Sequence, residues 1–182
     1  MILALDISTS ITGVTLLDKE GNRIFTGYTD TRKEIGFFNK VEKQKNEILN
    51  IIEVHCGDNN KFIERIFIEQ SLQAFRPGLS SAKVILALAG MNRTLSYLLY
   101  EALGLEPEYI GASTARKACG IKIPKGEKAK KVVLQFLLDN EADSMVEYTS
   151  FGNPKAPYYD MADSIVIARA GYEIWKSKNS DS

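Results

Sequence analysis

Three short apolar segments at the start of the chain constrain its fold more than any other feature. Residues 2–8, 11–18 and 23–29 each have the length and the apolar, β-branched composition of a strand. Only a few residues separate neighbouring segments, and the second gap is the polar sequence KEGN. Because connections this short join strands in antiparallel pairs, the chain is expected to open with a three-stranded antiparallel meander.

The rest of the chain alternates between helical and strand patterns. Apolar residues recur at helical spacing in five segments, and two further apolar runs have the length of a strand. A Ser pair marks the start of the second helix and Gly104 follows its end, while Ser113 or Thr114 is expected to cap the third. The predicted helices span residues 34–55, 80–103, about 113–119, 127–139 and 158–175, and the predicted strands span residues 62–69 and 108–113.

This order of elements predicts an α/β fold. Three antiparallel strands followed by strands that alternate with helices make a five-stranded mixed sheet in which the later strands are parallel, with helices on both faces. The length of 182 residues suits one domain, which we expect over residues 1–175. Residues 176–182 are expected to form a disordered tail.

Composition excludes several classes of protein. Lys and Arg together number 23 and so do Asp and Glu, so the chain is not a globally basic nucleic-acid binder. No run of eighteen apolar residues is present, so we expect no membrane span. Met1 leads straight into ILALDI without a basic leader, which argues against a secretory signal. Cys56 and Cys119 match no metal or redox spacing, and we expect free thiols in the cytoplasm.

Four acidic residues occur where carboxylates are costly or unusual. Asp6 interrupts the apolar run ILALDI, and Glu69 ends the run RIFI, at the strand end where ligands collect in α/β sheets. Asp160 and Asp163 are three residues apart, so they share one face of a largely apolar predicted helix. Each acid alone also has a structural explanation, as a turn cap, a strand end that reaches water, or an acid at a helix N-terminus.

Taken together, the four carboxylates favour a metal site over purely structural roles. They come from the first strand, the fourth strand and the last helix, and they could hold two Mg²⁺ ions about 4 Å apart. Such a pair clamps the attacking and leaving oxygens in phosphodiester cleavage, because one ion activates a water and the other stabilises the departing 3′ oxygen. The sequence therefore predicts a metal-dependent nuclease.

Three segments resemble the acidic motifs of the RuvC family of Holliday junction resolvases, in the style of its compact phage-encoded members. They are LALDISTSITGVTLLD, IFIEQS and YYDMADSIVIARA, and the similarity extends from Asp6 to about Gly171. The resemblance implies an RNase H-like fold, a homodimer, Mg²⁺ or Mn²⁺, and paired nicks in a four-way junction inside a bacterial or phage-infected cell. It makes Asp6, Glu69, Asp160 and Asp163 the catalytic metal ligands, and it leaves open whether other branched DNA is also cut.

The same resemblance implies a lysine that assists at the scissile phosphate. In the family this lysine precedes the third acidic motif, and the sequence GEKAKK is similar to that segment. Lys128 is the best match, and Lys122, Lys125 and Lys130 are the alternatives.

A basic segment and a loop are the candidates for DNA contact. Residues 113–131 hold seven basic residues and one acidic residue, which concentrates positive charge on one part of a neutral chain. In the loop at 70–81, Phe75 or Leu72 would act as an apolar wedge between bases, and Arg76 would bind phosphate. A solvated helix face and a loop packed on itself are the plainer interpretations. The seven basic residues are Arg116, Lys117, Lys122, Lys125, Lys128, Lys130 and Lys131.

Two other functions fit parts of the sequence. DISTSITG is typical of the phosphate loop of sugar kinases and actin-like ATPases, although those proteins need two such domains. A non-catalytic protein that binds DNA junctions on the same fold is the third interpretation, and the four acids disfavour it.

The predicted helix at 80–103 contains Ala87, Ala89 and Gly90 and is apolar on more than one side, which suits either a buried core helix or a dimer contact.

Overall fold

The computed structural model describes residues 1–56, 62–71, 81–140 and 146–180, which form five strands and five helices. Each predicted element is present, with ends that differ by a few residues. In chain order they are β1 (Ile2–Asp6), β2 (Ile11–Leu17), β3 (Arg23–Asp30), α1 (Phe37–Cys56), β4 (Arg65–Glu69), α2 (Ala82–Leu103), β5 (Glu108–Ile110), α3 (Ala112–Ala118), α4 (Ala129–Asn140) and α5 (Pro157–Ser180).

The five strands form one mixed sheet in the order β3-β2-β1-β4-β5. The first three strands pair antiparallel, whereas β4 lies parallel to β1 and β5 lies parallel to β4. The central strand β1 is buried on both faces, since Leu3, Ala4 and Leu5 are all fully shielded from solvent. This arrangement confirms the predicted α/β fold with an antiparallel meander followed by parallel strands.

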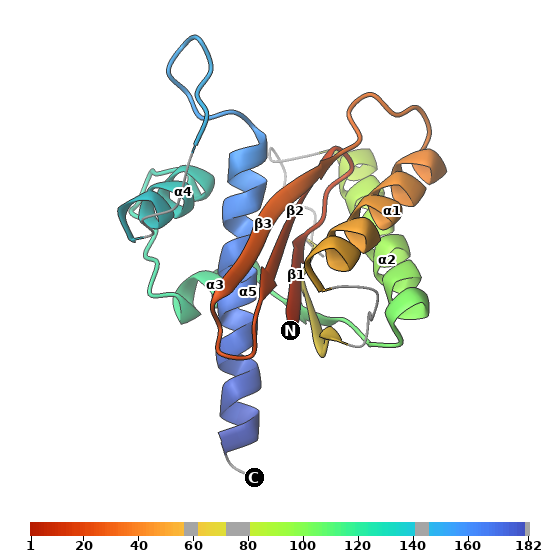
Figure 1. Cartoon of the computed structure of the whole chain (residues 1–182). Coiled ribbons are helices and arrows are strands. Elements are labelled where there is room, and N and C mark those ends of the chain that lie inside the picture. The colour runs from red at the N-terminus through yellow and green to blue at the C-terminus, as the bar shows by residue number, and fades with distance from the viewer. Residues whose placement is uncertain (57–61, 72–80, 141–145, 181–182) are drawn as a thin grey trace.

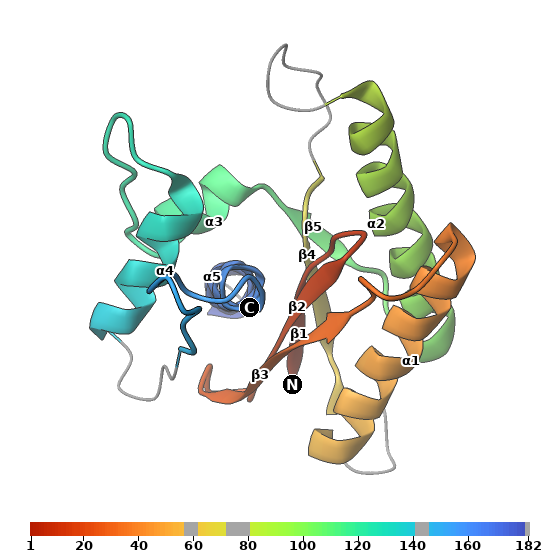
Figure 2. The ribbon, with the colours of Figure 1, turned by 90° about the horizontal axis from the view of Figure 1, so that it is seen from above.

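Helices cover both faces of the sheet and produce two separate apolar cores (Figures 1 and 2). On one face α5 lies across β1 and β2, and α3 and α4 pack against α5 from outside. On the other face α1 and α2 pack against the sheet and against each other. The domain therefore has three layers, with the sheet in the middle.

Strand alternation decides which core each side chain of β1 and β4 enters. Ala4 and Phe67 belong to the core under α5, whereas Leu5 and Ile68 belong to the core under α1 and α2. Leu5 pairs with Ile68, so the next residues, Asp6 and Glu69, end neighbouring parallel strands at the same level. Because successive side chains point to opposite faces, Asp6 and Glu69 both lie on the α5 side of the sheet.

The start of α5 lies unusually close to β2. A Cβ atom added to Gly13 would be 2.0 Å from the carbonyl oxygen of Asp160, so only glycine fits at this position. The contact is reinforced by a buried hydrogen bond of 2.8 Å between the hydroxyls of Thr15 and Ser164. The acidic first turns of α5 are thereby held against the sheet.

Two boundaries differ from the sequence-based expectations. The third helix begins at Ala112 after Gly111, which makes no side-chain cap, so the prediction that Ser113 or Thr114 caps this helix is wrong. The last helix extends to Ser180, although we expected a disordered tail from residue 176. An ion pair of 2.9 Å between Lys178 and Glu108 of β5 helps to hold this final part of α5.

The other helix ends agree with the signals in the sequence. Ser81 caps α2, because its hydroxyl accepts a hydrogen bond from the backbone N–H of Val84, and Gly104 ends the helix in a left-handed conformation. Among the described residues, Cys56 is buried, Cys119 is partly buried, and neither is in a disulfide. Within the described residues, no helix has the combination of length and apolar composition that a membrane crossing requires.

Candidate active site: an acidic cavity at the end of the sheet

A cavity of about 260 Å³ opens where β1 and β4 end and α5 begins. Asp6 and Glu69 reach it from the two strand ends, and Asp160 and Asp163 reach it from the first turns of α5. The structure therefore brings all four predicted acids to one place. The lining residues are Asp6, Ile7, Ser8, Glu69, Gln70, Ser71, Ile85, Leu88, Asn92, Lys130, Asp160 and Asp163.

Three of the four acids converge closely. Asp6, Glu69 and Asp163 each present one carboxylate oxygen, and these three oxygens lie within 4.8 Å of one another. Asp160 stands beside this group and binds Lys130 instead. Oxygen donors at this spacing are the ligands that Mg²⁺ and Mn²⁺ take from proteins.

Burial and mutual repulsion raise the pKa values of the three converging carboxylates, those of Asp6, Glu69 and Asp163. Burial raises the pKa of Asp6 well above its ordinary value, and the charges of Glu69 and Asp163 raise it further. Burial, followed by the charge of Asp163, raises the pKa of Glu69 to about 7. Burial also raises the pKa of Asp163, against the opposing charge of Lys130. A cation in the cavity would offset this repulsion, so the donor set fits a divalent metal.

Lys130, rather than Lys128, is the lysine of the cavity. Its ammonium lies 2.6 Å from Oδ1 of Asp160 and 3.5 Å from Oδ2 of Asp163. Burial lowers the pKa of Lys130, but the neighbouring charges of Asp6, Asp160 and Asp163 outweigh that effect and raise it. Lys128, the best match from sequence, is an exposed residue just before α4 and does not line the cavity.

Asn92 of α2 adds a polar group that the sequence did not single out. Its Nδ2 donates a 3.0 Å hydrogen bond to the backbone carbonyl of Glu69, and the residue is almost fully buried. Its Oδ1 has no hydrogen-bond partner among the described residues. The sequence feature that points to Asn92 is its polar carboxamide at the end of the otherwise apolar run VILALAGMN. Asn92 fixes the end of β4 and therefore the position of Glu69.

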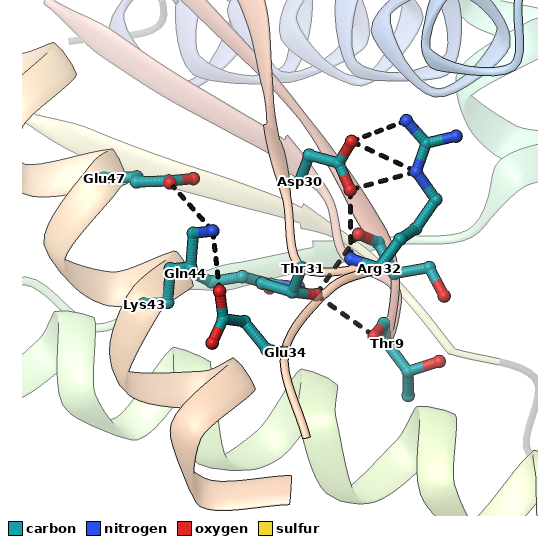
Figure 3. Close-up of polar contacts among 9 residues, drawn as sticks. Thr9, Asp30, Thr31, Arg32, Glu34, Lys43, Gln44 and Glu47 are labelled. Atoms are coloured by element: carbon teal, nitrogen blue, oxygen red, sulfur yellow. Dashed lines mark hydrogen bonds and ion pairs between the residues drawn. The ribbon is translucent and has the colours of Figure 1, made fainter. Parts of the chain in front are cut away.

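A second buried amide fixes the chain just after Asp6. Gln44 of α1 is completely buried; its Nε2 donates to the carbonyl of Ser8 at 2.9 Å, and its Oε1 accepts from the hydroxyl of Thr12 at 2.8 Å. Thr31, beside Gln44 in Figure 3, donates to the carbonyl of Thr9 at 3.2 Å. These contacts hold the β1–β2 connection, whose Ser8 forms part of the cavity wall.

Part of the predicted basic segment lies at the cavity, where Lys130 is one of the lining residues. Arg116 of α3 is half-buried, and it is close enough that its charge opposes the rise in the pKa of Glu69. The remaining basic residues of this segment, Lys117, Lys122, Lys125, Lys128 and Lys131, are exposed along α3, its connection to α4 and the start of α4. Phe75, Arg76 and Leu72 lie outside the described residues.

Comparisons with known proteins identify the fold. The structure of a RuvC from Thermus thermophilus in complex with Holliday junction substrate aligns with a TM-score of 0.63 and 13% identity, covering 96% of this chain and 95% of that one. A second Thermus thermophilus RuvC structure aligns with a TM-score of 0.59 and 14% identity, covering 97% and 96%. No family model and no curated protein sequence matches the chain. The chain thus has the RNase H-like fold of RuvC.

Proposed function

We propose that this chain is a divalent-metal-dependent endonuclease that cuts Holliday junctions or other branched DNA by paired nicks. The observation that carries the proposal is the convergence of Asp6, Glu69 and Asp163 within 4.8 Å. The fold supports it, since a RuvC with this fold has been solved with Holliday junction substrate. The interior of a bacterial or phage-infected cell is the corresponding place of action.

The acids of the cavity would bind the metal. Asp6, Glu69 and Asp163 would hold one Mg²⁺ or Mn²⁺ ion, and Asp160 would complete a site for a second. When bound, such ions lower the pKa of a water and neutralise charge on the phosphate. Asp160 already holds the ammonium of Lys130, so this lysine is positioned to bind a phosphate oxygen of the cut strand.

The basic residues from Arg116 to Lys131 would bind the DNA backbone. Lys130 lines the cavity and the charge of Arg116 reaches Glu69, whereas the other five basic residues are exposed along α3, its connection to α4 and the start of α4. Phosphate contacts of this kind position a nucleic acid without reading its sequence. A strand that lies along this surface would place one of its phosphates at the acids.

We also propose a homodimer through the outer face of α2. Leu86 is 72% exposed, and Tyr97 and Tyr100 are both about half exposed on the same helix. A two-fold axis would present two identical cavities to a junction that itself has two-fold symmetry, which accounts for paired nicks.

The direct test is to incubate the full chain with a synthetic four-way junction and Mg²⁺ and to map the cut positions. We expect paired nicks in the junction, little cutting of a linear duplex of the same sequence, and no cutting in EDTA. Asp6→Asn should abolish cleavage and keep junction binding, because it removes a metal ligand and leaves the basic surface intact. Binding without nicks by the wild-type chain would instead support a non-catalytic junction-binding protein.

A further inference from the structure

The chain segment just before α5 forms an ordered turn, which we call the pre-α5 turn (residues 147–155). Tyr148 and Pro154 form an antiparallel bridge, and the backbone N–H of Lys155 donates to the carbonyl of Glu147 at 2.9 Å. The tip is closed by a hydrogen bond of 3.0 Å from Gly152 N–H to the carbonyl of Thr149. Gly152 has a φ of 73°, which glycine adopts without strain. The backbone therefore defines where the side chains of this turn project.

Phe151 occupies the tip of this turn and is 88% exposed. Isolated apolar side chains on protein surfaces are common and need no explanation of their own. Phe151 differs because a hydrogen-bonded turn presents its whole ring to solvent and because Tyr148, 53% exposed, lies at the base of the same turn. An aromatic pair displayed in this way suits a flat, apolar partner surface.

The pre-α5 turn stands at the same end of the molecule as the acidic cavity. It runs directly into α5, where Asp160 lies three residues after Pro157, or about one helical turn. In Figure 1 the turn projects beyond the end of the sheet, above the start of α5. The turn and the cavity thus lie at the same end of the domain, where a bound nucleic acid would extend.

Charge indicates which part of a nucleic acid the turn contacts. Its two charged residues, Glu147 and Lys155, form an ion pair with each other, so the turn contributes no net positive charge for phosphate. What it offers is an aromatic ring, which stacks on any nucleobase through the base's π-face. The bases at the centre of a branched DNA are already partly unstacked, so insertion there costs less than in a duplex.

We propose that Phe151 stacks on a nucleobase at the branch point of the DNA while the scissile phosphate lies in the acidic cavity. The proposal rests on the proposed function, and it assigns to the pre-α5 turn the recognition of branched over linear DNA. The basic segment binds both forms through phosphate, whereas the ring of Phe151 gains a stacking partner only where a base is accessible.

Tryptophan fluorescence tests this contact, since stacking on a base quenches indole emission. Phe151→Trp in the full chain adds one reporter to the native Trp175, whose signal is subtracted by using the wild-type protein. The control is Phe62→Trp. Phe62 is also exposed, but its carbonyl accepts a hydrogen bond from the Met1 ammonium, at the end of the sheet where β1 and β4 begin and opposite the end that holds the cavity. Titrations use a synthetic four-way junction and a linear duplex in EDTA, which prevents cleavage.

We expect the junction to quench Trp at position 151 and not at position 62, and the duplex to quench neither. Phe151→Ala should weaken junction binding by about tenfold, within the range for loss of one base–aromatic stack, and leave duplex binding unchanged. Absence of quenching at position 151, or junction affinity unchanged in Phe151→Ala, would overturn the inference if the wild-type chain binds the junction. A wild-type chain that neither binds nor nicks junctions would instead refute the proposed function.

Discussion

Glu69 of the cavity has a strongly raised pKa. Its burial beside Asp163 raises its pKa to about 7, against an ordinary value of 4.5. The folded chain therefore binds this proton more tightly than the unfolded chain does. The bound proton therefore contributes to the free energy of unfolding. This contribution is complete below about pH 4.5 and is lost as the pH rises through about 7. It amounts to at most about 3 kcal/mol.

We predict that Glu69→Gln makes the metal-free protein more stable at pH 8 and flattens the change of its melting temperature between pH 5 and pH 8. The neutral amide removes the charge that burial disfavours. Thermal melting in EDTA measures the effect, with Glu42→Gln on the exposed side of α1 as the control. Mg²⁺ should stabilise the wild-type chain at pH 8 more than the variant. Parallel pH curves for the wild type and Glu69→Gln would contradict the prediction.

Lys130 is distinguished from its neighbours by its two carboxylate contacts. We predict that Lys130→Gln lowers the rate of junction cleavage by roughly 100-fold, as expected when a charge that stabilises the transition state is removed. Lys128→Gln is the matched control, because Lys128 is exposed and outside the cavity. Single-turnover cleavage rates at saturating protein measure both. A larger loss in the Lys128 variant would show that Lys128, and not Lys130, has the catalytic role.

The four acids were easier to predict from the sequence than the lysine and the buried amides that surround them. Asp6 and Glu69 each had a structural explanation when taken alone, and only the set of four acids on three separate segments favoured a shared metal site. The choice between Lys128 and Lys130 depends on where α4 begins, and its start at Ala129 could not be located to one residue. Asn92 and Gln44 act through contacts with segments 23 and 36 residues distant, and no local pattern reports such contacts.

At the scale of helices and strands, the position of α5 depends on Gly13. We predict that Gly13→Ala displaces the start of α5, because its Cβ would lie 2.0 Å from the backbone of Asp160. The expected loss of stability is about 1–3 kcal/mol or more, with weaker Mg²⁺ stabilisation because Asp163 moves with the helix. Denaturant unfolding with and without Mg²⁺ measures both effects.

Gly90→Ala is the control for this substitution. Gly90 is inside α2, and an added Cβ would meet the ring of Phe37 at an ordinary 3.8 Å. Alanine in a helix interior is favoured over glycine, so this variant should be at least as stable as the wild type. If Gly13→Ala unfolds like Gly90→Ala and retains its Mg²⁺ response, the close approach of α5 to β2 is not required.

Most elements were predictable from periodicity and turn signals. The three N-terminal strands have few alternative pairings, and Ser81 and Gly104 mark both ends of α2. The ends of α3 and α5 were predicted less well because tertiary contacts decide them. In particular, Lys178 of α5 pairs with Glu108 of β5, seventy residues earlier in the chain.

At the scale of the whole molecule, the exposed apolar side chains of α2 predict that two copies of the chain form a dimer. We expect the chain to have the mass of a dimer in solution and Leu86→Glu to convert it to a monomer, because a carboxylate would replace an apolar side chain at the contact. Val54→Glu on α1 is the control, since Val54 is similarly exposed on another helix. Light scattering after size-exclusion chromatography measures the mass. A monomeric wild type would exclude the proposed dimer.

The acidic cavity combines residues from the first strand and the last helix of the domain, since Asp6 lies in β1 and Asp163 in α5. During translation, the ribosome adds residue 163 after nearly all the rest of the domain has been made. An incomplete or truncated product without α5 has Asp6 and Glu69 but lacks the other two acids. If the chain is a nuclease, DNA is therefore not exposed to its cutting activity until synthesis of the domain is almost finished.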